Sequence, residues 1–291
     1  MLKKRNPITR RHALGAMAGA SGAVLALGSH AAAADEAPLK GRLKQSVSAW
    51  CYKIPLEELA KEAARIGLKS VELLDEKQWS VVQDQGLTCA MPNGPGGIAK
   101  GWNDPRNHDE LVAKSEDLLP KIKTAGLDKM IVFSGNRRPR LDESEGLRNC
   151  VRGLKRIVPL AEELGITLTM ELLNSKRDHN HYMCDHTAWG VALAKDLGTK
   201  NFGLLYDIYH MQIMEGDIIT TIQENIDYIV HFHTGGVPGR NEIDDSQELN
   251  YRRIAQAIVD TGYDGYFGHE FVPAGPDPIA SLTEAARICD V

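Results

Sequence analysis

The chain has 291 residues, of which 43% are hydrophobic and 25% are charged, a composition that excludes disordered, fibrous and multi-span membrane proteins. The formal net charge of −5 hides an asymmetry, because residues 1–34 carry five basic side chains and no acidic one. The remaining 257 residues hold 29 basic and 39 acidic side chains, a net charge of −10. This acidic body argues against nucleic acid as a partner, since phosphate contacts need a basic surface. It suits a small ligand or a metal ion better.

The first 34 residues have the pattern of a transport signal. The pair Arg10-Arg11 precedes an apolar run from Ala13 to Leu27 that is rich in alanine and glycine, and small residues follow at 29–34. The run is shorter than the roughly 20 apolar residues that a membrane-spanning helix needs. We therefore expect a cleaved twin-arginine signal peptide at 1–34, recognised by the twin-arginine export machinery, with a periplasmic product and no stable membrane insertion.

The cysteines form no recognisable motif and are odd in number. They are Cys51, Cys89, Cys150, Cys184 and Cys289. The twin-arginine route carries proteins that have already folded in the reducing cytoplasm, so we expect no structural disulfide even after export.

From about residue 44, short apolar runs rich in β-branched residues alternate with amphipathic segments. The runs, taken as eight strands, are Ser46–Cys51, Ser70–Leu74, Leu87–Met91, Met130–Ser134, Thr167–Leu173, Phe202–Tyr206, Ile229–Thr234 and Tyr266–Phe271. Helix patterns with apolar residues at i, i+3 and i+4 include Leu56–Ile66, Leu147–Leu164, Ile218–Ile226 and Arg252–Thr261. Strands and helices that alternate at this spacing predict parallel β-α units.

Glycines indicate on which side of the sheet the long loops lie. Five of them follow a helix pattern and precede a strand closely, the position of a left-handed helix cap: Gly67, Gly126, Gly165, Gly198 and Gly262. The strand-to-helix connections are longer and more polar, as at Pro92–His108 and Asn174–His186. Eight strands whose long loops all follow the C-terminal strand ends predict an α/β fold of the (β/α)8 TIM-barrel class. The active site of such a barrel lies at these strand ends. A doubly wound sheet is less favoured, because residues 52–55 form no glycine-rich phosphate loop.

Each of the last four strands ends in a potential metal ligand. These residues are Glu171, Asp207, His233 and Glu270, separated by 36, 26 and 37 residues, about one β-α unit each. The ends of parallel strands meet at one end of a barrel, and buried carboxylates need a cation or hydrogen-bond donors. Three carboxylates and one imidazole predict a site for one divalent metal ion, Mn²⁺ or Mg²⁺ from the oxygen ligands, with Co²⁺ or Zn²⁺ possible through the histidine.

Four segments resemble the hydroxypyruvate isomerase family, within the xylose isomerase-like TIM-barrel superfamily. The most specific is Tyr206-Asp207-Ile208-Tyr209-His210-Met211-Gln212-Ile213-Met214-Glu215-Gly216-Asp217. The others are Glu171-Leu172-Leu173-Asn174, Val237-Pro238-Gly239-Arg240-Asn241-Glu242 and Glu248-Leu249-Asn250-Tyr251. The resemblance covers essentially all of 44–291, so we expect one signal peptide, 1–34, and one isomerase domain, 35–291.

The resemblance implies roles for individual residues. Glu171, Asp207, His233 and Glu270 would bind the metal, and Glu171 and Glu270 would also be the acid/base pair on opposite faces of the substrate. His210 and Arg240 would hold substrate oxygens. The implied reaction is the isomerisation of a small carbonyl substrate, hydroxypyruvate to tartronate semialdehyde. Relatives are commonly dimers or tetramers, so a homo-oligomer is expected.

Two alternatives stay open. His233 stands where hydroxypyruvate isomerases generally have glutamine and the related ketose 3-epimerases have histidine. Together with the export signal, this favours an exported ketose 3-epimerase or keto-sugar isomerase as the alternative activity. A non-catalytic periplasmic sugar-binding barrel is the alternative of a different class, although it would not need two carboxylates facing each other.

A DNA endonuclease of the same superfamily is disfavoured. It would need several zinc ions and a basic groove, whereas this chain is acidic and has one candidate ligand at each of the four strand ends.

Other candidates are assigned to packing or left open. His231, two residues before His233, is expected one layer deeper, and His269 is expected to face the helix layer. Trp50 and Trp102 are candidates for the pocket wall, with plain packing equally compatible. His179, His181 and His186 have a spacing that fits no common metal site.

Overall fold

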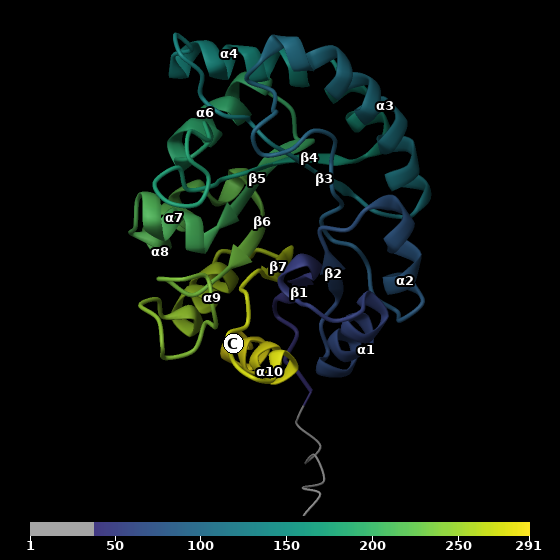
Figure 1. The fold of residues 1–291 in the computed structure, drawn as a ribbon, viewed down its shortest axis with the longest axis vertical. Helices are drawn as coiled ribbons and strands as arrows, with labels where there is room; N and C mark the ends of the chain where they lie inside the picture. The colour runs from purple at the N-terminus through teal and green to yellow at the C-terminus, as the bar shows by residue number, and fades with distance from the viewer. Residues whose placement is uncertain (1–37) are drawn as a thin grey trace, which may run out of the picture. The chain divides into compact units, whose positions relative to one another are not determined.

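Seven parallel strands form the centre of the computed structural model, which describes residues 38–291 (Figure 1). The strands are β1 (Lys44–Ser48), β2 (Ser70–Glu72), β3 (Lys129–Val132), β4 (Thr167–Glu171), β5 (Phe202–Asp207), β6 (Ile229–Thr234) and β7 (Tyr266–His269). They pair in the order β2-β1-β7-β6-β5-β4-β3, and every neighbouring pair is parallel. Figure 1 shows them curled into a ring with the helices outside, the expected TIM-barrel arrangement.

The predicted strand Leu87–Met91 lies in the gap between β2 and β3 without forming a regular strand. On the β2 side, the amide of Leu73 donates to Met91 O at 2.8 Å. On the β3 side, the amide of Ile131 donates to Pro92 O at 3.2 Å. Pro92 has no N–H to continue a ladder, and Leu73 has a left-handed φ of 58°. The eighth segment therefore closes the ring with fewer hydrogen bonds than a regular strand.

Helices form at three of the four predicted apolar patterns. The helices of the described residues are α1 (Leu56–Ile66), α2 (Trp79–Gln83), α3 (His108–Thr124), α4 (Glu143–Leu154), α5 (Val158–Leu164), α6 (Thr187–Leu197), α7 (Ile208–Met214), α8 (Ile218–Asn225), α9 (Tyr251–Asp260) and α10 (Pro278–Ile288). The three that match a predicted pattern are α1, α8 and α9. The single helix pattern at Leu147–Leu164 is wrong, because the chain forms α4 and α5 there. Pro159 sits in the first turn of α5, where its missing N–H is tolerated and its fixed φ favours a new helix start.

The five cap glycines have the backbone conformation that the sequence predicts. Gly67, Gly165 and Gly198 end α1, α5 and α6 with φ of 102°, 67° and 66°. Gly126 and Gly262 have φ of 73° and 83°. A Cβ is disfavoured at such angles, so these turns stay tight and the barrel's longer loops lie at the other strand ends.

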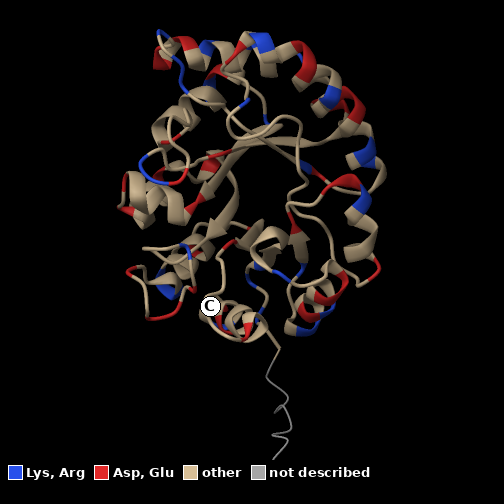
Figure 2. Ribbon diagram, in the orientation of Figure 1, with Lys and Arg blue, Asp and Glu red and all other residues tan. Residues whose placement is uncertain are grey.

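The interior is mainly apolar, and the buried acidic residues Glu72, Glu171, Asp207 and Glu270 lie at the carboxyl ends of the strands. Figure 2 shows most acidic and basic residues on the outer helices and loops, for example along α3. The five cysteines are buried free thiols. Among residues 38–291, no helix is long and apolar enough to cross a membrane. The expected signal peptide at 1–34 lies outside the described residues.

Candidate active site

The structure brings together the four predicted metal ligands. Glu171 and Asp207 are the last residues of β4 and β5, His233 is the penultimate residue of β6, and Glu270 directly follows β7. One ligand atom from each lies within 4.8 Å of all the others, and all four residues are buried. The parallel pairing explains this convergence, since it sets Asp207 beside His233 and His233 beside Gly268.

The donor set fits a divalent cation. His233 Nδ1 lies 2.8 Å from Glu270 Oε2 and 3.5 Å from Glu171 Oε1. Despite this closeness, Nδ1 has no aligned hydrogen-bond partner within residues 38–291. An imidazole nitrogen and two carboxylates that face a common point without hydrogen bonding suit a shared ion. Burial also raises the pKa of Asp207 to about 8 although Arg240 lowers it, so the fully ionised set needs a further positive charge.

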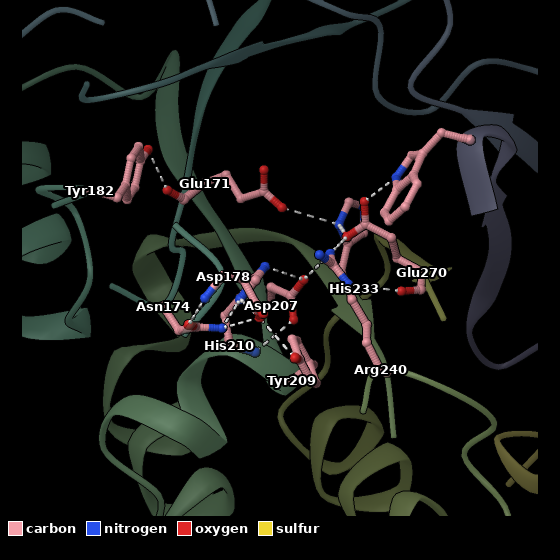
Figure 3. A network of polar contacts seen from close by, with 12 residues as sticks. Glu171, Asn174, Asp178, Tyr182, Asp207, Tyr209, His210, His233, Arg240 and Glu270 are labelled. Atoms are coloured by element: carbon pink, nitrogen blue, oxygen red, sulfur yellow. Dashed lines mark hydrogen bonds and ion pairs between the residues drawn. The ribbon is translucent and has the colours of Figure 1, made fainter. Parts of the chain in front are cut away.

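The two carboxylates expected to act as acid and base have different surroundings. Glu270 Oε1 accepts a hydrogen bond from Trp50 Nε1 and Oε2 accepts one from Arg240 Nη2, both at 2.7 Å. Burial opposes ionisation of Glu270, but His233 and Arg240 outweigh it and hold its pKa well below the usual range. For Glu171 burial prevails and raises the pKa. Figure 3 shows the two carboxylates reaching His233 from opposite sides.

Arg240 joins the site from the loop between β6 and α9. Its Nη2 lies 2.7 Å from Glu270 Oε2 and 3.3 Å from Asp207 Oδ2. The guanidinium carbon is 5.1 Å from the ring centre of Trp50 and 5.3 Å from that of Tyr209, distances typical of cation–π contacts. Arg240 is therefore held between two aromatic rings and supplies one fixed positive charge to the cluster.

His210 presents one ring nitrogen to the site. The backbone amide of His210 donates to Asp207 Oδ1 at 3.0 Å, which caps α7 and brings its ring beside the cluster. Its Nε2 lies 3.7 Å from Asp207 Oδ2 and has no hydrogen-bond partner in the described part of the chain. Burial and the nearby Arg240 lower the pKa of His210 well below its usual value, so the ring is neutral.

The Asn174 amide fixes the tautomer of His210. Asn174 Oδ1 accepts from the backbone amides of Arg177 and Asp178, both at 3.0 Å, so its Nδ2 must be the donor. Nδ2 donates to His210 Nδ1 at 2.6 Å and to Asp178 Oδ2 at 2.7 Å (Figure 3). A neutral imidazole that accepts at Nδ1 carries its proton on Nε2. His210 therefore offers an N–H donor to a molecule in the site.

Sequence reasoning missed Glu72, the last residue of β2. Its fully buried carboxylate contacts both His231 and His233. The available signal was the one used for the other strands, namely a carboxylate at the end of an apolar run, here Ser70–Leu74. Asn174 belongs to the resembling segment Glu171–Asn174, but no sequence pattern assigned it a role. The contact of Trp50 with Glu270 is visible only in the three-dimensional structure.

The residues assigned to packing lie as follows. His231 is buried below His233, and His269 Nε2 contacts Gln45 Oε1 at 2.7 Å, where Gln45 in turn donates to the backbone of α10. His269 therefore faces the helix layer, as predicted. Trp102 is fully buried and packs against His108 at the start of α3, so it does not line the site.

Several residues of the resembling segments have structural partners. The Glu215 carboxylate accepts from the hydroxyl and amide of Thr187 at the start of α6. The Glu242 carboxylate accepts from the amides of Ala274 and Gly275, at 2.9 Å and 3.0 Å, and ties the loop after β6 to the loop after β7. These residues hold the loops around the site and do not enter it.

Comparisons with known proteins assign the family. A family model described as "Xylose isomerase-like TIM barrel" matches residues 60–289. The chain is 30% identical to the 2-oxo-tetronate isomerase of Cupriavidus necator over 225 residues, covering 72% of this chain and 85% of that protein. It is 33% identical to the human protein named "Putative hydroxypyruvate isomerase" over 236 residues, 81% of each chain. The chain therefore belongs to the xylose isomerase-like TIM-barrel family. Within it, the chain is an enzyme of the isomerase class.

Solved structures confirm the fold. A structure titled AP endonuclease, family 2, from Brucella melitensis superposes with a TM-score of 0.76 at 24% identity, covering 85% of this chain and 98% of that one. A D-psicose 3-epimerase solved in the presence of D-fructose has a TM-score of 0.69 at 20% identity, covering 84% and 96%. At these identities the similarity establishes the barrel alone, so the choice of reaction depends on the site.

Proposed function

We propose that the protein is a divalent-metal-dependent isomerase of small hydroxy-carbonyl compounds that converts hydroxypyruvate to tartronate semialdehyde. The observation that carries the proposal is the buried cluster of four ligands, in which Glu171 and Glu270 approach from opposite sides and hydrogen bonds from Trp50 and Arg240 occupy the oxygens of Glu270. The relatives named for hydroxypyruvate and 2-oxo-tetronate isomerisation support this substrate class.

Four residues would hold the cation, and their oxygen-rich set favours Mn²⁺ or Mg²⁺ over Co²⁺ or Zn²⁺. When bound, such an ion stabilises negative charge that develops on substrate oxygens. The chain adds Arg240, whose charge offsets part of the three ligand carboxylates.

Glu171 is the proton-transfer residue in this proposal. Both oxygens of Glu270 already accept hydrogen bonds, from Trp50 and Arg240, which leaves Glu171 freer to exchange a proton. It removes a proton from C3 of hydroxypyruvate and returns it to C2, while the C3 hydroxyl proton passes to the former C2 carbonyl oxygen. His210 Nε2–H donates to a substrate oxygen, as can Arg240 through its guanidinium, and Glu270 stays ionised throughout.

The alternative is a ketose 3-epimerase with the same site. Its specific support is the approach of Glu171 and Glu270 from opposite sides, as epimerisation uses a carboxylate on each face. The chain is also 33% identical, over 129 residues, to the D-psicose 3-epimerase of Agrobacterium fabrum. Epimerisation would require Glu270 to exchange a proton as well, which its hydrogen bonds from Trp50 and Arg240 oppose.

The test follows deuterium entry from D₂O by NMR, using residues 35–291 with Mn²⁺ and offering hydroxypyruvate or a panel of ketoses. We expect label and tartronate semialdehyde from hydroxypyruvate. Glu171→Gln should slow the reaction by about 10²–10⁴-fold. Glu163→Gln, on the exposed surface of α5, is the matched control and should leave the rate unchanged.

Two results would contradict this proposal. Label that enters only a ketose, and that disappears in both Glu171→Gln and Glu270→Gln, would assign the epimerase activity. Full activity after removal of all divalent metal by a chelator would exclude the metal dependence.

We also propose export through the twin-arginine route, supported by the pattern at residues 1–34. The full chain carrying Arg10→Lys and Arg11→Lys should stay in the cytoplasm while the unchanged chain reaches the periplasm, measured by cell fractionation. Lys3→Arg with Lys4→Arg is the matched control, since it changes basic residues outside the pair. Equal export of all three chains would contradict this proposal.

A further inference from the structure

Glu72 reaches across the barrel interior to two histidines on β6. It comes from β2 and is separated from His231 and His233 by 159 and 161 residues. Its Oε1 lies 2.7 Å from His233 Nε2 and 2.9 Å from His231 Nε2. All three residues have no exposed surface. One carboxylate oxygen therefore meets the rear nitrogen of a proposed metal ligand.

Gly268 on β7 leaves the space for this contact. A Cβ at this position would lie 2.4 Å from Glu72 Oε1 and 2.8 Å from His233 Cδ2. Both distances are shorter than packed atoms allow, so any larger residue would displace the Glu72 carboxylate or the His233 ring. The backbone angle of Gly268 does not require glycine, which makes the close approach the physical reason for it.

The contact decides which nitrogen of His233 faces the cluster. A carboxylate oxygen only accepts hydrogen bonds, so the Nε2 atoms of His233 and His231 carry hydrogens. A neutral His233 with its hydrogen on Nε2 presents the Nδ1 lone pair to Glu171, Glu270 and an ion between them. Without Glu72, the Nδ1–H tautomer would compete and would leave no lone pair on the metal side.

We propose that Glu72 is a positioning residue that fixes the tautomer and ring orientation of His233 for metal binding, with His231 as the second donor that holds the Glu72 carboxylate. This inference rests on the metal site of the proposed function. The same three residues also form a compact group of potential ligands. A second metal ion there is the competing assignment, and the experiment separates the two.

The first measurement is Mn²⁺ binding by titration calorimetry on the protein 35–291. We expect one ion per wild-type chain and affinity about 10–100-fold weaker in Glu72→Ala. Glu72→Gln keeps the shape of the side chain and one acceptor oxygen, so it should recover part of the Mn²⁺ affinity. It also provides a folded variant for the test if Glu72→Ala does not fold. His108→Gln removes another buried histidine contact, to Trp102 O at 2.8 Å, and should leave Mn²⁺ affinity unchanged.

The second measurement is the tautomer of neutral His233 by ¹⁵N NMR of histidine side chains in the metal-free protein at alkaline pH, assigned with His233→Gln, because a metal on Nδ1 would itself keep the hydrogen on Nε2. We expect a hydrogen on Nε2 in the wild type and its loss or a mixture in Glu72→Gln. Gly268→Ala should change the same signal although it removes no hydrogen-bonding group.

Three outcomes would overturn the inference. Wild-type Mn²⁺ affinity and unchanged His233 signals in both Glu72 variants would remove the positioning role alone. Two bound ions in the wild type, with the second lost in His231→Gln, would establish a second metal site instead. No Mn²⁺ binding by the wild type would overturn this inference together with the proposed metal dependence.

Discussion

Two histidines in the site are held by different parts of the molecule. His233 belongs to the strand side, where the barrel ladder and the buried Glu72 carboxylate hold it. His210 belongs to the loop side, where Asn174, in the loop after β4, orients its ring. The carboxylate behind His233 leaves a lone pair facing the site, and the amide behind His210 leaves an N–H facing it. The same type of side chain thus presents a lone pair, suited to the proposed metal ion, in one place and a hydrogen-bond donor in the other.

Because the strand side and the loop side present different groups to the site, mutations can separate their contributions. In the proposed function the strand-side residues would hold the ion, so their loss should appear first in metal affinity. The loop-side residues would contact the substrate, so their loss should appear in kcat/KM with metal affinity unchanged.

The largest effect is expected for Asp207→Asn on the strand side. The amide keeps an oxygen to cap α7 but loses the charge that a cation needs, so Mn²⁺ affinity should fall by more than about 100-fold. Asp178→Asn is the loop-side counterpart, because Asp178 accepts from Asn174 and Tyr209. Calorimetry with Mn²⁺ on both variants tests whether strand-side and loop-side residues differ in this way. Equal losses of Mn²⁺ affinity would contradict the difference.

Asp185→Asn should lower the free energy of unfolding by about 2 kcal/mol at neutral pH. The buried Asp185 carboxylate accepts from Arg137 Nη1 and Nη2, at 3.0 Å and 2.9 Å, and joins the loops after β3 and β4. Burial opposes ionisation, but Arg137 and Ser175 outweigh it and lower the pKa of Asp185.

A lowered pKa in the folded state gives this effect a defined pH dependence. The stabilisation is complete above the unfolded-state pKa of about 4 and is lost as the pH falls through the folded-state pKa. Urea unfolding of the wild type and of Asp185→Asn from pH 7 to pH 3 should show that their difference in free energy of unfolding narrows below about pH 4. A difference that widens there would contradict the assignment.

Asn174→Leu removes four hydrogen bonds of the side-chain amide, among them the one to His210 Nδ1, and should reduce kcat/KM about tenfold because His210 is then free to adopt the other tautomer. Mn²⁺ affinity should stay within a factor of two. Steady-state kinetics and calorimetry on the same preparation check both statements. Asn201→Leu, which loses a contact with Ile166 O at the opposite end of β4, is the matched control.

The smallest effect is expected for Trp50→Phe. The ring remains beside Arg240, but Glu270 loses the donor to Oε1. Because the Trp50 side chain is 52% exposed, water can replace the lost hydrogen bond, and activity should fall by less than about fivefold. A loss above a hundredfold would assign Trp50 a direct role with the substrate.

Local sequence patterns predicted most of the barrel. Glycine at a helix end, such as Gly67 or Gly198, is required by the local backbone angle and is visible without tertiary information. The patterns were less accurate at Leu87–Met91 and at Leu147–Leu164. In the first, the chain closes the ring through a few hydrogen bonds around Pro92; in the second, Pro159 starts a separate helix.

The sequence alone predicts that Glu171, Asp207, His233 and Glu270 meet, because parallel strands of one barrel bring their carboxyl ends to the same side. How these four side chains differ chemically depends on tertiary contacts. Glu72 and Trp50 come from β2 and the turn after β1, and no sequence spacing links them to β6 and β7. Hydrogen bonds and burial depend on distances across the barrel, and these determine which carboxylate oxygens accept hydrogen bonds and which histidine nitrogen faces the site.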